Sequence, residues 1–148
     1  MWQIWEASSF AGCTLPATPG GPAWRMKTGV GFNGLETYAA GAVVRFPVPY
    51  LEGTILEAAK VKWAGVDGEG TLIVRVIKRD ESSPASTETM LAEEEENCPA
   101  EYAVIEADLS STVIVEDFSY WVEVESNLTT DSPQIIWMVG IQTSKRIL

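Results

Sequence analysis

The chain has 148 residues, a formal net charge of −11 and no histidine. A chain of this length fits one domain with a sizeable core, and the absence of histidine excludes Ser-His-Asp and Cys-His nucleophile arrangements and His-based metal sites. Fifteen Asp and Glu residues, but no Lys or Arg, lie between Asp80 and Asp131. One face is therefore expected to be strongly negative, which argues against binding to nucleic acid or an anionic membrane.

Residues 1–35 are dense in glycine and proline, which disfavour both regular helix and central strand. The segment also holds too many bulky aromatic residues for a free linker. We therefore predict either an extended N-terminal arm or a set of loops laid over the domain, which contributes to assembly rather than to the core. The aromatic side chains expected to contact the domain or a neighbour are those of Trp2, Trp5, Phe10, Trp24 and Phe32.

The remaining residues, 36–148, carry the alternating pattern of β-strands and are predicted to form the domain. Strands are expected at 42–46, 54–63, 71–79, 102–107, 113–115, 119–125 and 134–141. Residues 80–100 are expected to be mostly loop, with a short helical turn or an edge strand as the alternatives for 87–91. A glycine-rich turn at 65–70 predicts a hairpin between the second and third of these strands. The pattern predicts an all-β, antiparallel β-sandwich of about eight strands with under a tenth helix.

Several short motifs occur in a characteristic order over residues 38–144. An apolar strand runs into a proline-bearing turn, Phe46-Pro47-Val48-Pro49-Tyr50-Leu51-Glu52-Gly53, and is followed by Gly53 to Val61, Leu72 to Val76, Tyr120 to Val124 and Val139-Gly140-Ile141. This order resembles the jelly-roll modules of phage particle proteins and of carbohydrate-binding regions. A compact acidic sandwich with a Gly/Pro-rich arm is similar to capsid decoration (cement) proteins, and the resemblance implies an arm that reaches the shell or a neighbouring subunit in a trimer.

The N-terminus lacks the basic start and apolar stretch of a signal peptide, and no apolar run is long enough to span a bilayer. This favours a virion protein over a secreted sugar-binding protein. We therefore predict a non-enzymatic structural protein of a bacteriophage virion, assembled in the host cytoplasm, that binds the major capsid protein or another virion protein as a homotrimer. The alternative is a carbohydrate-binding or receptor-binding β-sandwich module. Neither prediction involves a cofactor, nucleic acid or a membrane.

Trp121 is the best candidate for an exposed aromatic ring, because it alternates with core positions of its strand. It would serve as a stacking platform for a sugar, pack under the arm or in a subunit interface, or lie in the core. Glu123 and Glu125 share a strand face about 7 Å apart. That spacing suits paired catalytic carboxylates, but two solvent-facing residues are the simpler interpretation, and no catalytic residue is predicted.

The acidic run Glu93–Glu96 is interpreted as a solvated loop, with contact to a basic partner or calcium recruitment as alternatives. Calcium needs six to eight converging oxygens, and the candidate ligand sources are Asp67 with Glu69, and Glu116 with Asp117 and Asp131. No EF-hand spacing is present, and no metal site is predicted. Cys13 and Cys98 are expected to be free thiols rather than a disulfide.

Overall fold

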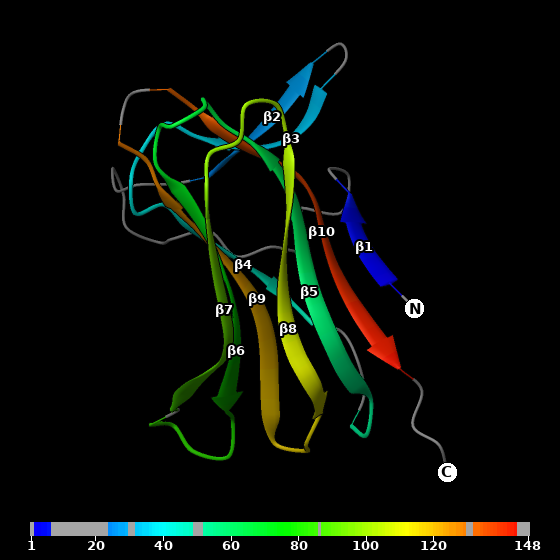
Figure 1. The fold of residues 1–148 in the computed structure, drawn as a ribbon. Coiled ribbons are helices and arrows are strands. Elements are labelled where there is room, and N and C mark those ends of the chain that lie inside the picture. The colour runs from blue at the N-terminus through cyan, green and yellow to red at the C-terminus, as the bar shows by residue number, and fades with distance from the viewer. Residues whose placement is uncertain are drawn as a thin grey trace.

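A computed structural model describes residues 2–6, 24–29, 32–48, 52–85, 87–129 and 132–144 (Figure 1). Over these residues the chain forms ten β-strands and no helix. The strands are β1 Trp2–Glu6, β2 Arg25–Gly29, β3 Phe32–Thr37, β4 Val43–Pro47, β5 Ile55–Ala64, β6 Thr71–Asp80, β7 Glu88–Asn97, β8 Ala103–Val113, β9 Phe118–Asn127 and β10 Gln134–Ser144. The described part of the chain contains no helix that could cross a membrane.

The strands form two antiparallel sheets that pack face to face (Figure 1). One is six-stranded, with the order β2-β3-β10-β5-β8 and with β1 paired to the later part of β10. The other is four-stranded, with the order β4-β9-β6-β7. The predicted all-β antiparallel sandwich of the jelly-roll type is therefore confirmed.

The core lies between the two sheets and is built mainly by side chains that alternate along the strands. On the four-stranded sheet β6 turns Leu72, Val74 and Val76 inward, and β9 does the same with Val122 and Val124. Burial of a large apolar side chain contributes about 1.5–3 kcal/mol each. The largest side chains with no exposure at all come from both layers and include Trp24, Trp63, Phe46, Leu35, Leu56, Leu72, Ile105, Ile136 and Ile141.

The predicted hairpin between residues 54–63 and 71–79 is wrong, because β5 and β6 belong to different sheets. The glycine-rich connection at 65–70 carries the chain from one layer to the other, a spacing of about 10 Å in a sandwich. Gly70 has a φ of +91°, and a Cβ at this position would lie 2.3 Å from the Asn127 backbone oxygen. Only glycine fits this crossing.

Residues 80–100 are not mostly loop, because Glu88–Asn97 forms the edge strand β7 along β6. Leu91 and Ala92 pack against the core and attach the strand to the sandwich. The acidic run Glu93–Glu96 is therefore part of a strand. The edge-strand alternative for residues 87–91 covered only the first part of β7, because the four consecutive glutamates interrupt the apolar alternation. Charged edge strands are a common way of preventing edge-to-edge pairing.

The N-terminal segment contributes to the fold. The strands β1, β2 and β3 belong to the six-stranded sheet, and Trp24 and Leu35 are completely buried in the core. Trp24 donates its indole N–H to the backbone oxygen of Ala42 at 3.0 Å. The prediction that residues 1–35 stay apart from the core is therefore wrong for these two residues, because the strands supply the surface that the aromatic side chain needs.

The other arm residues lie outside the described part. This holds for Phe10 entirely and for the side chains of Trp2, Trp5 and Phe32, whose backbones lie in β1 and β3. Their contact with a partner, and the division into an arm at 1–35 and a domain at 36–148, stay predictions.

Candidate functional site

The outer face of the four-stranded sheet, which points away from the core, carries two adjacent rows of side chains set by the strand register. The charged row consists of Arg45, Glu123, Arg75 and Glu93, one from each strand. The apolar row consists of Pro47, Trp121, Ile77 and Met90. Along β4, β9 and β6 the two rows are two residues apart, which keeps them on the same face.

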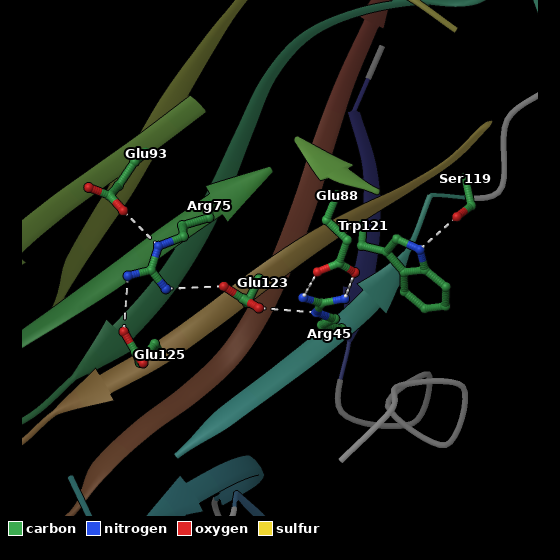
Figure 2. A network of polar contacts seen from close by, with 8 residues as sticks. All are labelled: Arg45, Arg75, Glu88, Glu93, Ser119, Trp121, Glu123 and Glu125. Carbon is green, nitrogen blue, oxygen red and sulfur yellow. Dashed lines mark hydrogen bonds and ion pairs between the residues drawn. The ribbon is translucent and has the colours of Figure 1, made fainter. Parts of the chain in front are cut away.

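Glu123 is the centre of the charged row (Figure 2). Its two carboxylate oxygens accept hydrogen bonds at 3.0 Å from Arg45 Nε and from Arg75 Nη1. The residue is only 8% exposed. A carboxylate with so little water is stable when two guanidinium groups replace its hydration, so Glu123 holds β4, β9 and β6 in one arrangement.

Arg75 lies next to Glu123 in the charged row, on the side opposite Arg45. It donates from Nε to Glu93 at 2.6 Å and from Nη2 to Glu125 at 3.0 Å (Figure 2). Burial disfavours the guanidinium charge, but the hydrogen bonds to Glu93, Glu123 and Glu125 outweigh it and raise the pKa of Arg75 above its ordinary value. Arg75 is therefore a fixed cation surrounded by carboxylates.

A bidentate ion pair joins the two edge strands across the outer face. Arg45 on β4 donates from Nη1 and Nη2 to the two carboxylate oxygens of Glu88 on β7, at 2.5 and 2.8 Å. Three strand spacings separate these strands, or about 14 Å in a flat sheet, so two long side chains must reach toward each other above β9 and β6. Hydrogen bonds from Arg45 lower the pKa of Glu88, and the bond to Glu88 raises the pKa of Arg45.

This Arg45–Glu88 bridge runs diagonally over the apolar row. Arg45 lies in the charged row, whereas Glu88 pairs with Arg79, beyond the apolar row. Ile77, below the bridge, is only 7% exposed although it lies on the outer face. The bridge therefore covers the apolar row at Ile77, whereas Trp121 stays partly exposed and Met90 is 54% exposed.

Trp121 is partly exposed in the apolar row and is oriented by hydrogen bonds (Figure 2). Its indole N–H donates to Ser119 Oγ at 3.0 Å, and the Ser119 hydroxyl donates to Glu81 at 2.6 Å. The ring thus lies on the outer face with its polar edge satisfied. An indole beside fixed charged groups suits a ligand with one apolar face and a hydrogen-bonding rim.

Among the described residues, the other candidates from the sequence do not gather into a further site. Glu123 and Glu125 both bind Arg75, and Glu93 does the same, so these carboxylates act as ion-pair partners. Within the described residues, no group of three or more His, Cys, Asp or Glu residues is placed to hold a metal ion. Of the calcium candidates, Asp131 lies outside the described residues.

Cys98 is a buried free thiol at one end of the sandwich. It donates to the Glu69 backbone oxygen and accepts from Gln134 Nε2, both at 3.3 Å. Burial raises the pKa of the thiol, which is packed so closely that a Cβ on Gly65 would lie 2.7 Å from its sulfur. Cys13 lies outside the described residues.

Sequence reasoning missed the two arginines and a second aromatic group. Arg45 and Arg75 occupy outward positions of predicted strands. Their place in the alternation of inward and outward residues could have identified them as members of the outer face. On the other sheet, Tyr102 is 64% exposed and contacts Trp137 edge-to-face, with ring centroids 6.0 Å apart. The sequence did not single out Trp137, because its strand carries apolar residues on both faces and the pattern does not show which of them are exposed.

Comparison with known proteins gives matches in structure alone. No family model and no curated protein matches the sequence. The CBM22-2 xylan-binding domain of Xyn10C from Paenibacillus barcinonensis matches with a TM-score of 0.64 and 14% identity over 97% of this chain and 99% of that domain. The CBM22-1 domain of the same enzyme gives 0.62 and 10% identity over 98% and 95%.

A third neighbour is the CBM36-1 domain of a multidomain xylanase from the hindgut metagenome of Trinervitermes trinervoides. Its TM-score is 0.59, with 12% identity over 98% of this chain and 99% of that domain. At such identities the likeness shows a shared fold. That fold is the β-sandwich jelly roll of carbohydrate-binding modules, covered almost from end to end.

Proposed function

We propose that the protein is a non-catalytic carbohydrate-binding module that holds a polysaccharide on the outer face of the four-stranded sheet. The observation that carries the proposal is the apolar row containing Trp121, which lies directly beside the charged row on one accessible face. Two of the structural neighbours are described as xylan-binding domains, which supports the same class of ligand.

The chemistry of a sugar ring suits this pair of rows. One side of a pyranose presents C–H groups that stack on an aromatic ring, and its rim presents hydroxyls that hydrogen-bond to charged groups. The charged row is fixed before a ligand arrives, because Glu123 bonds to both Arg45 and Arg75. Such preorganisation lowers the cost of ordering side chains on binding.

The same contacts argue against a catalytic role for the carboxylate pair Glu123 and Glu125. Glu123 is held between two guanidinium groups, and Glu125 accepts from one of them. Glycoside hydrolysis needs one carboxyl group that is protonated at working pH and another that is free to attack or activate water. Both oxygens of Glu123 are occupied by guanidinium groups, so this carboxylate is not free to attack or to activate water.

The structural neighbours favour the carbohydrate-binding alternative over the capsid-decoration interpretation, since those named above are all carbohydrate-binding modules. The homotrimer, its binding to the major capsid protein and the virion localisation stay predictions.

The first test is affinity gel electrophoresis of the whole chain against soluble xylan, mixed-linkage β-glucan, galactomannan and galactan, followed by titration calorimetry with the retained polysaccharide. Replacing Trp121 with Ala is expected to lower the affinity at least tenfold, because the ring provides the stacking surface. The matched control is Trp137→Ala, which removes an indole from the other sheet and is expected to leave the affinity within about twofold.

Two results would contradict the proposal. A wild-type chain that binds none of these polysaccharides, and no polygalacturonate either, would show that the function is wrong. A chain whose binding is lost in Trp137→Ala and kept in Trp121→Ala would place the site on the six-stranded sheet. Circular dichroism of both variants checks that each remains folded.

A further inference from the structure

The arginines of the outer face have their donors occupied by carboxylates of the same chain. Every nitrogen of Arg45 donates to a carboxylate, Nε to Glu123 and both terminal nitrogens to Glu88. Every nitrogen of Arg75 does so as well, to Glu93, Glu123 and Glu125. An anionic group that approaches these guanidinium groups in the two-pronged geometry therefore competes with an internal carboxylate.

The third arginine on this face is also paired, and carboxylates outnumber the guanidinium groups. Arg79 Nε lies 3.4 Å from Glu81 Oε1. Besides the acidic partners already named, β7 adds Glu95 opposite Ile73. A polysaccharide with carboxylate or sulfate groups would meet a net negative surface, which costs binding energy without a compensating pair.

Among these acidic partners Glu88 differs in position and geometry. It forms the one two-pronged bond to a guanidinium group in this network, the same arrangement that a free carboxylate adopts with arginine. Its side chain is 39% exposed, whereas that of Glu123 is 10% exposed. Glu88 thus occupies, at the surface, the place where the carboxylate of an acidic sugar would bind Arg45.

We propose that Glu88 determines the specificity of the outer face by occupying Arg45, so that the face accepts uncharged polysaccharides and rejects those that carry uronic acids or sulfates. This inference rests on the proposed function, because it concerns the ligand class of the same site. If Glu88 only stabilised the fold, its removal would not create binding to a new ligand class. If Glu88 determines specificity, its removal creates binding to acidic polysaccharides.

The test compares two single substitutions on the same strand. Glu88→Ala removes one negative charge and frees the two terminal nitrogens of Arg45. Glu95→Ala removes the same charge from the same face of β7, at a residue away from the two rows and the bridge. Binding of the wild type and both variants is measured by titration calorimetry with neutral xylan oligosaccharides and with polygalacturonate oligosaccharides, at 20 and 500 mM NaCl.

The wild type is expected to bind the neutral probe and to bind polygalacturonate at least tenfold more weakly. Glu88→Ala is expected to gain at least tenfold in affinity for polygalacturonate at 20 mM NaCl and to lose most of that gain at 500 mM, because the new contact is an exposed ion pair. Glu95→Ala is expected to behave as the wild type with both probes.

The possible failures are distinguishable. A wild type that binds neither polygalacturonate nor any neutral polysaccharide of the first screen contradicts the proposed function itself. A wild type that binds polygalacturonate alone contradicts only the inference. A wild type that binds both probes equally contradicts only the inference, as does a Glu88→Ala variant without a gain. An equal gain in Glu88→Ala and Glu95→Ala would show that net charge, and not Arg45, decides. If Glu88→Ala is unfolded by circular dichroism, Glu88→Gln gives the same comparison with the side-chain length kept.

Discussion

Glu123 is a charged residue that the sequence predicted to face solvent, yet it is nearly buried. Its strand position does face outward, but Arg45 and Arg75 cover it from both sides. A side chain on the outside of a sheet can thus be desolvated by its neighbours in the same row. This explains how a carboxylate contributes to the rigidity of an exposed surface.

Replacing Glu123 with Gln is expected to lower the free energy of unfolding by about 1–3 kcal/mol, because it weakens two charge-assisted hydrogen bonds and leaves two arginines with fewer partners. The matched change Glu125→Gln affects one bond of a residue whose side chain is 27% exposed. It is expected to cost less than about 1 kcal/mol. Urea denaturation measures both, and equal losses would show that the burial of Glu123 has no energetic consequence.

At the scale of the strands, alternation of apolar residues predicted β5, β6 and β9 well. Leu72, Val74 and Val76 lie inward as their spacing requires, and the opposite parity places Trp121 on the outer face. The strand β7 was predicted only in part, as one alternative for residues 87–91, because five of its ten residues are glutamates. The apolar alternation that predicts a strand is weak in β7, and pairing with β6 holds these residues in the sheet.

The arrangement of the candidate site was much harder to predict than the strands. Arg45 and Glu88 are 43 residues apart in sequence and lie on opposite edges of a sheet. Their contact depends on the strand order and on the register of three separate strand pairs, which no local pattern contains. The same holds for the crossing at 65–70, whose glycine-rich turn fits a hairpin and a change of sheet equally well.

The tie between the edge strands β4 and β7 is expected to depend on pH. Because Arg45 lowers the pKa of Glu88 below its ordinary value of 4.5, the ionised form is favoured in the folded protein. The stabilisation is therefore present in full above about pH 5 and is lost as the pH falls through the lowered folded pKa. Because Glu88 is well exposed and solvent screens its charge, this stabilisation amounts to less than about 1 kcal/mol.

Denaturation of the wild type and Glu88→Gln between pH 7 and pH 3 checks this dependence. The difference in stability between the two proteins should be constant at neutral pH and disappear in acid, where the wild-type carboxyl is protonated and resembles the amide. A difference that grows on acidification would mean that the bridge does not stabilise the charged form of Glu88.

At the scale of the whole molecule, the described part of the N-terminal segment belongs to the sandwich. The strand β3 pairs with the first part of β10, and β1 pairs with its later part. Trp24 lies in the core between the two sheets. The Gly/Pro-rich composition indicated an arm, but the described residues of this segment form strands of the six-stranded sheet and part of the core.

Deleting residues 1–37 is therefore expected to abolish cooperative unfolding. Loss of a buried Trp alone costs about 3–5 kcal/mol, and the deletion also removes three strands from a domain whose total stability is typically 5–15 kcal/mol. The matched control is deletion of residues 1–6, which removes β1 only and is expected to leave a cooperative transition at lower temperature. A chain lacking 1–37 that melts like the wild type would restore the prediction of a separate arm.

The packing of Cys98 has a consequence for the dynamics of the sandwich. The residue is 3% exposed, and its thiol is enclosed by Gln134 and by the Gly65 and Glu69 backbones, at the end where the chain passes between the sheets. A thiol reagent reacts with the thiolate, which burial disfavours, so labelling must wait until this end separates. In a Cys13→Ser background, the labelling rate of Cys98 would therefore measure how often the two sheets separate at this end while the protein remains folded.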